Sequence, residues 1–242
     1  MSMRSRAIVL KTIRYNDDSL IAEAFTETSG RVSFIVRIAH SRRAAVKHTL
    51  FRPLALLMLE WNHRPSSRLQ RLQGASVDIA LHSLPYDPGK TTISLFLAEF
   101  LHFALRAEPD ASALFRYVST SIEWLDACRS SYANFHLVFL LRLTRFLGFY
   151  PNLSNSSANS YFDLETACFV PARPLHNHFI APPDAGRLPL LMRMNYATMH
   201  LFRFSGTERS RLLGYINDFY RLHLPDFPEL KSLPILTEVF SS

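Results

Sequence analysis

The chain has few cysteines, few glycines and no long apolar segment, and each shortage excludes a class of protein. Two cysteines, Cys128 and Cys168, are too few for the disulfide framework of a secreted protein, which favours a reducing compartment. Seven glycines and 19% charged residues argue against a disordered chain. The apolar runs fall far short of the roughly 20 residues that cross a membrane, and residues 1–15 lack the apolar run of a signal peptide. The sequence therefore predicts a soluble, cytoplasmic protein.

Catalytic motifs are missing as well. The chain contains no glycine-rich phosphate loop and no G-x-S-x-G elbow, and its carboxylates are scattered without an acid/base or two-metal set. The segment DPGKTT at 87–92 is similar to a phosphate loop only superficially, because it lacks the first glycine and the preceding apolar strand. We interpret it as the N-terminus of a helix. The sequence predicts that the protein is not an enzyme.

What the chain does have is an unevenly distributed positive charge. Residues 1–74 carry 13 Lys and Arg against 5 Asp and Glu, whereas residues 75–242 carry 14 against 15. The excess behind the net charge of +7 therefore lies in the first third of the chain. A concentrated basic patch favours binding to a polyanion, most often nucleic acid, over the alternative that the charge only aids solubility.

The first 74 residues have the pattern of short strands. In the segment 31–38, Val32, Phe34 and Val36 alternate with polar residues, and the preceding TETSGR with Gly30 predicts a hairpin turn. Five such segments, with a long basic connection at 41–49 after the third, predict a five-stranded OB-type barrel, with an SH3-like barrel as the alternative. The segments rich in strand-forming residues are 6–15, 19–28, 31–40, 54–61 and 67–74.

Residues 75–242 have the pattern of a mainly helical domain, so the predicted fold class is α+β. Gly148 is placed to end one helix, with Pro151 just beyond it, and Ser205 and Glu208 have the spacing of a capping box. Apolar residues at helical spacing predict helices over 91–108, 110–128, 131–152, 205–225 and 230–240, with a short one at 76–84.

The basic residues of the first domain form the predicted nucleic-acid site. On an OB-type barrel, strands two and three and the adjoining loops bind oligonucleotides. Tyr15 and Trp61 are candidates for base-stacking platforms, with a place in the core or at the barrel rim as the alternative. The cations predicted to contact phosphates without reading sequence are Arg4, Arg6, Lys11, Arg14, Arg31, Arg37, Arg42, Arg43 and Lys47.

Five segments occur in an order that is specific to one bacterial family. They are IVLKTIRYNDDSLIAEAFTETSGRVSFIVR at 8–37, LFLAEFLHFAL at 95–105, LFRYV at 114–118, NFHLVFLLRLTRFLGFYPN at 134–152 and YRLHLPDFPELKSLPILTEVF at 220–240. With this set the chain resembles the bacterial recombination mediators of the RecO family over nearly its whole length. The last two segments look most like the Bacteroidetes branch.

The resemblance implies a function in DNA repair. It implies an N-terminal OB-fold domain at 1–74 that binds single- and double-stranded DNA and anneals complementary strands, followed by a helical domain at 75–242. It also implies binding to RecR and to the C-terminal tail of the single-stranded DNA-binding protein, so that RecA loads onto coated gaps, and a nucleoid-associated location. The alternative is a generic OB-fold RNA-binding or RNA-chaperone protein, which only the resemblance in the helical domain disfavours. A metal-dependent nuclease is a third possibility, motivated only by His176-Asn177-His178.

One binding residue is carried over from the resemblance. In relatives, an arginine six residues before the glycine that ends this helix helps to hold the partner's tail, and the matching residue is Arg142, before Gly148. A tail that ends in a carboxylate after an apolar residue needs a cation beside apolar walls. We expect Phe139, Leu143 and Phe146 to form those walls, with the alternative that Arg142 only covers the end of a core helix.

Residues 151–187 are predicted to be a degenerate, zinc-free form of the four-cysteine module that many relatives carry. Such a module needs paired thiolates, and this stretch contains only Cys168. His176 and His178 add two possible ligands, but a Cys-His-His set lacks a fourth partner, and the consecutive letters His-Asn-His are not the arrangement of HNH nucleases. We therefore expect no zinc and no cofactor. Packing is expected to replace the metal through Phe162, Phe169 and Phe179.

Overall fold

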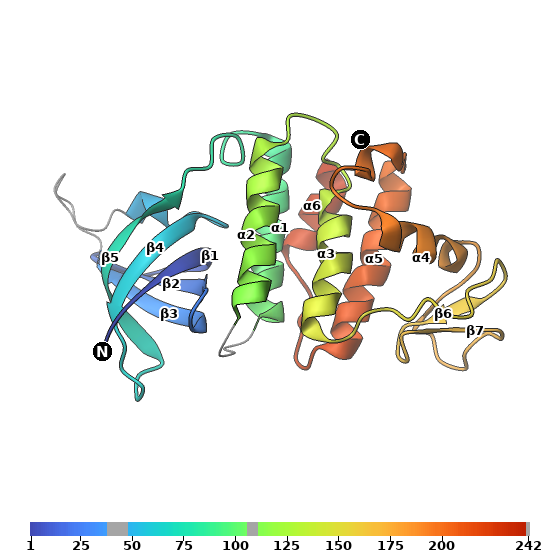
Figure 1. The fold of residues 1–242 in the computed structure, drawn as a ribbon, viewed down its shortest axis with the longest axis horizontal. Helices are drawn as coiled ribbons and strands as arrows, with labels where there is room; N and C mark the ends of the chain where they lie inside the picture. The colour runs from blue at the N-terminus through green and yellow to red at the C-terminus, as the bar shows by residue number, and fades with distance from the viewer. Residues whose placement is uncertain (38–47, 106–110, 241–242) are drawn as a thin grey trace. The chain divides into compact units, whose positions relative to one another are not determined.

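The structure is a computed structural model, and it describes residues 1–37, 48–105 and 111–240. The chain divides into two compact units, Met1–Ala127 with Leu230–Leu236 and Cys128–Glu229 with Thr237–Ser242. Figure 1 shows the elements of both units, coloured along the chain. In the described part of the chain, no helix has the length and apolar character needed to cross a membrane.

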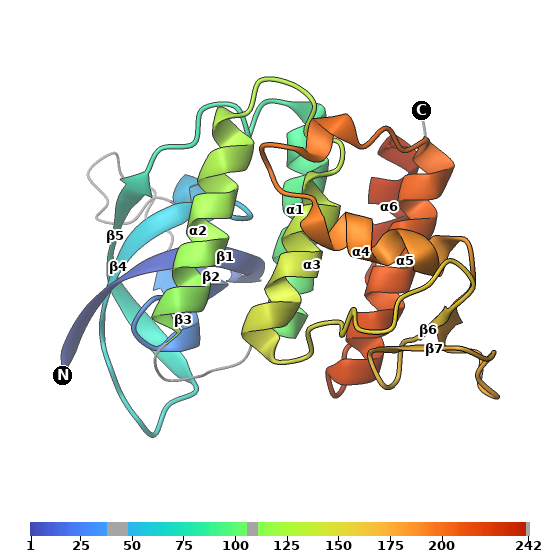
Figure 2. The same ribbon diagram turned by 45° about the vertical axis from the view of Figure 1, so that its right-hand side comes forward.

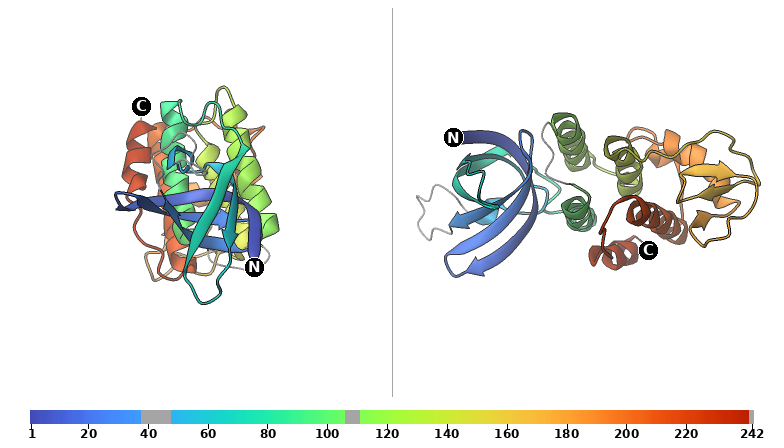
Figure 3. Two further views of the ribbon diagram at one scale, coloured as in Figure 1. Left: turned by 90° about the vertical axis from the view of Figure 1, so that its left-hand side faces the viewer. Right: turned by 90° about the horizontal axis from the view of Figure 1, so that it is seen from below.

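The first unit begins with a closed barrel of five strands. Around the barrel the order is β1-β2-β3-β5-β4, and β1 closes the ring by pairing with β4 (Figure 3). The parallel pairing of β3 with β5, which skips β4, gives the Greek-key order of an OB fold and confirms the predicted barrel. The strands are β1 (Ser2–Asn16), β2 (Ser19–Thr26), β3 (Gly30–Arg37), β4 (Leu56–Asn62) and β5 (Leu69–Ile79).

The alternation predicted for β3 is confirmed by burial. Phe34 and Val36 lie in the barrel core, whereas Arg37 is exposed. Trp61 of β4 is fully buried, and its ring contacts Phe34 edge-on at a centroid distance of 5.3 Å. Trp61 is therefore a core residue and is excluded as a stacking platform.

The hairpin between β2 and β3 has the predicted turn. Gly30 has a φ of 62°, a conformation that costs glycine little because it has no Cβ. The Thr26 hydroxyl donates to the Gly30 carbonyl at 2.8 Å and accepts the Ser29 N–H at 3.1 Å. Both bonds hold the turn that sets the β2–β3 register.

One expected element is wrong. The segment 76–84 was predicted as a short helix, but Ser76 and Val77 pair with Met58 and Leu57 of β4 and belong to β5. The barrel therefore ends at Ile79, beyond the expected boundary at residue 74. Hydrogen bonds to β4 make this segment a strand, because the apolar periodicity of so short a stretch does not distinguish a helix from a strand.

Helices complete the first unit. The segment 87–92 is a helix N-terminus as interpreted, because the Asp87 side chain accepts the Lys90 N–H at 3.0 Å. Lys90 is buried, and its ammonium donates to the Ser83 hydroxyl and the Asp126 carbonyl. The helices before residue 128 are η1 (His48–Leu50), α1 (Pro88–Ala104) and α2 (Ser112–Ala127). The last helix along the sequence is α6 (Ser232–Val239).

The second unit packs helices against a small sheet. Helix α3 contacts both α4 and α5, and α4 contacts β6 (Figure 1, Figure 2). The predicted caps are confirmed: Gly148 ends α3 with a φ of 85°, and Ser205 and Glu208 form a capping box. Its elements are α3 (Phe135–Leu147), β6 (Tyr161–Asp163), β7 (Cys168–Val170), β8 (Phe179–Ile180), α4 (Asp184–Arg193), η2 (Met199–Leu201) and α5 (Gly206–His223).

Candidate nucleic-acid interface

One side of the barrel wall meets helices of the first unit, and Arg6 lies there. Its Nε donates to Asp78 Oδ2 at 2.7 Å, and its guanidinium lies over the Phe115 ring of α2 at 5.4 Å. The hydrogen bond to Asp78 raises the pKa of Arg6 above its ordinary value, although burial opposes this. A phosphate would have to displace these partners.

Arg31 and Lys11 lie beside helix α1. Arg31 donates to the His102 carbonyl, and the Lys11 ammonium is 3.5 Å from His102 Nε2. His102 Nδ1 lies 3.0 Å from Glu23 of β2, and this hydrogen bond lowers the pKa of Glu23 despite its partial burial. Arg31 is half-buried and Lys11 is exposed, so of the two Lys11 is more accessible to a ligand.

Farther along the same strands, the outer wall of the barrel carries a row of side chains that crosses four strands. The register pairs Ile13 with Ile21, Ile21 with Ile35, and Ile35 with Arg71. Ile13 is 47% exposed, Arg71 is exposed, and the other two are half-buried. Arg37, two residues after Ile35, is on the same outer side of β3. We call these five residues the open barrel face.

The open barrel face combines apolar surface with two cations. Among the described residues, neither Arg37 nor Arg71 forms an ion pair. Tyr15, two residues past Ile13, is 61% exposed. Apolar or aromatic surface beside cations is what a single nucleic-acid strand needs for base stacking and phosphate contact.

Two predicted cations form ion pairs on the surface. Arg14 lies 2.9 Å from Asp17, and Arg4 lies 3.4 Å from Glu60, with all four side chains at least half exposed. Such pairs stabilise a protein by only about 0–1 kcal/mol, so phosphates can compete for both arginines. The remaining predicted cations lie outside the described residues: Arg42, Arg43 and Lys47.

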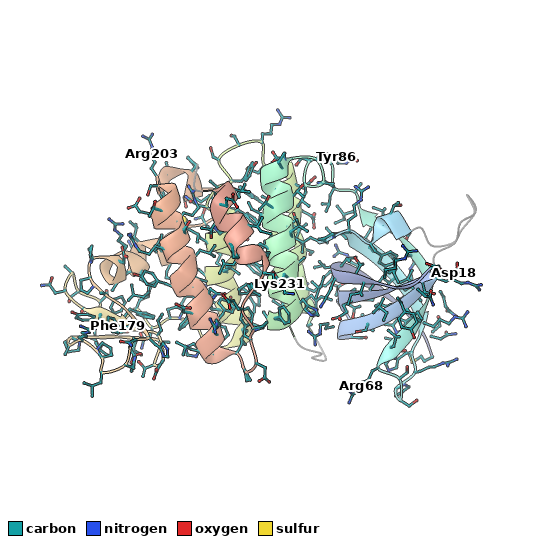
Figure 4. The ribbon with its side chains drawn as sticks, turned by 180° about the vertical axis from the view of Figure 1, so that it is seen from behind. Asp18, Arg68, Tyr86, Phe179, Arg203 and Lys231 are labelled. Atoms are coloured by element: carbon teal, nitrogen blue, oxygen red, sulfur yellow. The ribbon has the colours of Figure 1, made fainter. Side chains whose placement is uncertain are left out.

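The connection between β4 and β5 adds basic residues that the sequence did not single out. Arg64 and Arg68 are exposed there, and Arg68 points away from the barrel in Figure 4. The buried Gln70 amide shapes this loop, because it accepts the Arg64 N–H at 2.8 Å and donates to the Arg64 and Ser67 carbonyls. The β4–β5 loop is a ligand-binding loop of OB folds, so these arginines were recognisable by position.

In the second unit, the expected tail-binding residues divide into two groups. Arg142 and Phe146 are exposed on α3, with Arg142 donating to the Met194 carbonyl at 3.4 Å. Phe139 and Leu143 are fully buried. The expectation that they form accessible walls is therefore corrected, because both side chains point into the core of the unit.

A four-cysteine zinc module does not fit this chain. It has two cysteines in all, and both are free thiols. Strands β6 and β7 of this region pair antiparallel, and Phe162 packs edge-on against Phe169 with ring centroids 5.1 Å apart.

Comparison with known proteins agrees with this architecture. Two family models, described as Recombination protein O N terminal and C terminal, match residues 1–79 and 85–234. DNA repair protein RecO of Bacteroides fragilis is 54% identical over 241 residues, covering 99% of this chain and all of that protein. The proteins of that name from Phocaeicola vulgatus and Flavobacterium psychrophilum are 52% and 33% identical, over the full length of both chains. The chain therefore belongs to the RecO family of DNA repair proteins.

Proposed function

We propose that this protein is a DNA-binding recombination mediator. It binds single- and double-stranded DNA through the barrel and anneals complementary strands. With RecR it helps to load RecA onto gaps coated by the single-stranded DNA-binding protein. It acts by binding and strand pairing, without making or breaking covalent bonds.

The open barrel face carries this proposal. Arg37 and Arg71 flank an apolar row on the strand surface that OB folds use for oligonucleotides, with Arg64 and Arg68 on the adjoining loop. Contacts to phosphates and stacking on apolar or aromatic surface are largely independent of base sequence. Annealing requires this, because an annealing protein must accept any pair of complementary strands. The family favours DNA over the RNA-binding alternative.

A charge-reversed barrel tests the proposal. We expect the double variant R37E/R71E to bind fluorescein-labelled oligo(dT) at least roughly tenfold more weakly than the wild type in an anisotropy titration. Each phosphate contact adds roughly 0.7 to the slope of log K against log salt, so losing two should lower that slope by about 1.4.

The control is R129E, which makes a single arginine-to-glutamate reversal, half the charge change of the double variant, at an exposed residue of the second unit. It should leave both the affinity and the slope nearly unchanged. If R37E/R71E bound oligo(dT) like the wild type, or lost no more affinity than R129E does, DNA would bind elsewhere. Tighter binding of oligo(U) than of oligo(dT) would favour the RNA alternative.

We further propose that Arg142 holds the carboxylate end of the partner's tail, with Phe146 as its apolar neighbour. Arg142→Ala should weaken binding of a synthetic tail peptide by at least roughly 1 kcal/mol in calorimetry. Arg145→Ala is the control, because that guanidinium lies over the Tyr150 ring at 4.7 Å. Equal losses in both variants, or none in Arg142→Ala, would contradict the assignment.

A further inference from the structure

Three side chains that can bind metals converge beside the small sheet of the second unit. Glu165 lies in the turn between β6 and β7, and His176 and His178 lie just before β8. Glu165 Oε1 is 2.9 Å from His178 Nδ1 and 3.7 Å from His176 Nδ1. One ligand atom from each of the three lies within 4.8 Å of the others.

The fold positions these residues through the backbone of the small sheet. The Asp163 carboxylate shapes the turn, because it accepts the Glu165 N–H and the Thr166 hydroxyl, each at 2.9 Å. On the other side, the Leu164 N–H donates to the His178 carbonyl at 3.0 Å, which fixes the histidine segment beside the turn. Figure 4 labels Phe179, the residue directly after His178. The cluster is thus held by hydrogen bonds of the turn and of the segment next to the pairing of β6 with β8.

The separations suit a metal ion. Bonds of about 2.0–2.2 Å to nitrogen and oxygen ligands in a tetrahedron place neighbouring ligand atoms about 3.3 Å apart. The two distances from Glu165 to the histidines lie on either side of this value. Small side-chain rotations would therefore be enough to admit an ion.

Both ring nitrogens of His176 have neighbours that fix the orientation of the ring. Its Nδ1 accepts the His178 backbone N–H at 3.2 Å, so in the neutral ring the proton is on Nε2. Nε2 lies 3.4 Å from Asp163 Oδ1. A carboxylate on one ring nitrogen orients metal-binding imidazoles in many proteins, and a metal ion on Nδ1 would replace the contact with the His178 N–H.

We propose that Glu165, His176 and His178 form a binding site for a divalent transition-metal ion, with water completing the coordination. The site contains no thiolate and so differs from a four-cysteine module. A bound ion would tie the β6–β7 turn to the segment before β8. Imidazole and carboxylate ligands favour Zn²⁺, Co²⁺ or Ni²⁺, whereas Mg²⁺ and Ca²⁺ prefer oxygen ligands alone.

The inference reverses the expectation of a metal-free insertion. That expectation depended on the missing partner of the Cys-His-His set. The structure brings Glu165, which lies 13 residues before His178, to the two histidines in place of Cys168, and water completes the proposed coordination. Cys168 is the first residue of β7 and is paired with Asp163.

Calorimetry on tag-free, chelator-stripped full-length protein tests the site. We expect one Zn²⁺ to bind per chain, and Glu165→Gln and His178→Gln each to weaken binding at least roughly tenfold. His200→Gln changes an exposed histidine elsewhere in the unit, and Cys168→Ser removes the nearby thiol. Both controls should bind like the wild type.

Two further readouts guard against misfolding and assign the ligands. Zn²⁺ should raise the melting temperature of the wild type and not that of Glu165→Gln, whose far-ultraviolet circular dichroism should match the wild type. The Co²⁺ complex should show d–d absorption without a thiolate charge-transfer band. The proposal would be overturned if Zn²⁺ did not bind, if both ligand variants bound it as tightly as the wild type, or if Cys168→Ser lost binding. The DNA affinity of Glu165→Gln should be unchanged, so this test is independent of the proposed function.

Discussion

At the scale of single residues, His136 is a buried group whose pKa differs strongly from that of a free histidine. It lies within α3 at 1% exposure. Burial, together with the positive charge of Arg209, lowers the pKa of His136 from 6.5 to about 3. The folded protein therefore keeps this ring neutral over most of the acidic range.

This predicts a loss of stability in mild acid. Below pH 6.5 the unfolded chain takes up a proton at His136 that the folded chain refuses, so unfolding is favoured as pH falls until it reaches about 3. Between pH 6 and 4, His136→Leu should flatten the pH dependence of the unfolding free energy by up to about 1.4 kcal/mol per pH unit. Urea titrations at several pH values measure this dependence of the unfolding free energy on pH. The exposed-site control His200→Asn should keep the wild-type slope, and an unchanged slope in His136→Leu would contradict the assignment.

Individual burial was the least predictable feature of the sequence. The sequence was equally consistent with Trp61 as a base-stacking platform and as a core residue, and only its burial in the closed barrel shows that it is a core residue. Phe139 lies one helical turn from Arg142 and Leu143 is adjacent to it, but both occupy the buried side of α3. A helix that is apolar on most of its surface gives little indication of which side meets solvent.

At the scale of secondary-structure elements, the N-terminus of α5 can be tested directly. The Ser205 hydroxyl accepts the Glu208 N–H at 3.1 Å, and the Glu208 carboxylate accepts the Ser205 N–H at 3.0 Å. Ser205→Ala should lower the unfolding free energy by about 1 kcal/mol, whereas Ser205→Gly should cost only a few tenths. Ser210→Ala, inside the same helix, should be nearly neutral. Equal effects of Ala and Gly at 205 would show that the hydroxyl does not cap the helix.

Helices and strands with strong local sequence signals were predictable, and those whose form depends on contacts with distant segments of the chain were not. The apolar spacing and caps of α1, α3 and α5 are local properties, and the sequence located all three. Helix α4 was missed because Pro189 lies inside it and Pro182 and Pro183 precede it, which are signals of a loop. The extension of β5 to Ile79 depends on its pairing with β4.

At the scale of the whole molecule, the candidate DNA site also depends on contacts between distant segments, which the sequence does not reveal. Arg37 was predicted from the alternation within a single strand. Arg71 was not, because its position beside Ile35 depends on the parallel pairing of β3 with β5. That pairing joins strands more than 30 residues apart and follows from barrel closure, which no local pattern specifies. The basic first third of the sequence predicts the barrel domain as the nucleic-acid site, and the strand register adds Arg71 to the proposed face.

The two units are expected to have separable tasks, because the open barrel face lies in one and Arg142 in the other. R37E/R71E should slow annealing of both naked strands and strands coated by the single-stranded DNA-binding protein, since each reaction requires phosphate contact. Arg142→Ala should slow only the coated reaction, because tail binding matters only when the coat is present. Sites that share no partners have nearly additive effects, so the combined variant should show the sum of the two losses in activation free energy on coated DNA. A fluorescence-quenching assay with complementary labelled strands measures all four cases, with R129E as the charge control. If Arg142→Ala slowed annealing of naked strands as much as that of coated strands, Arg142 would contact DNA and not the partner's tail.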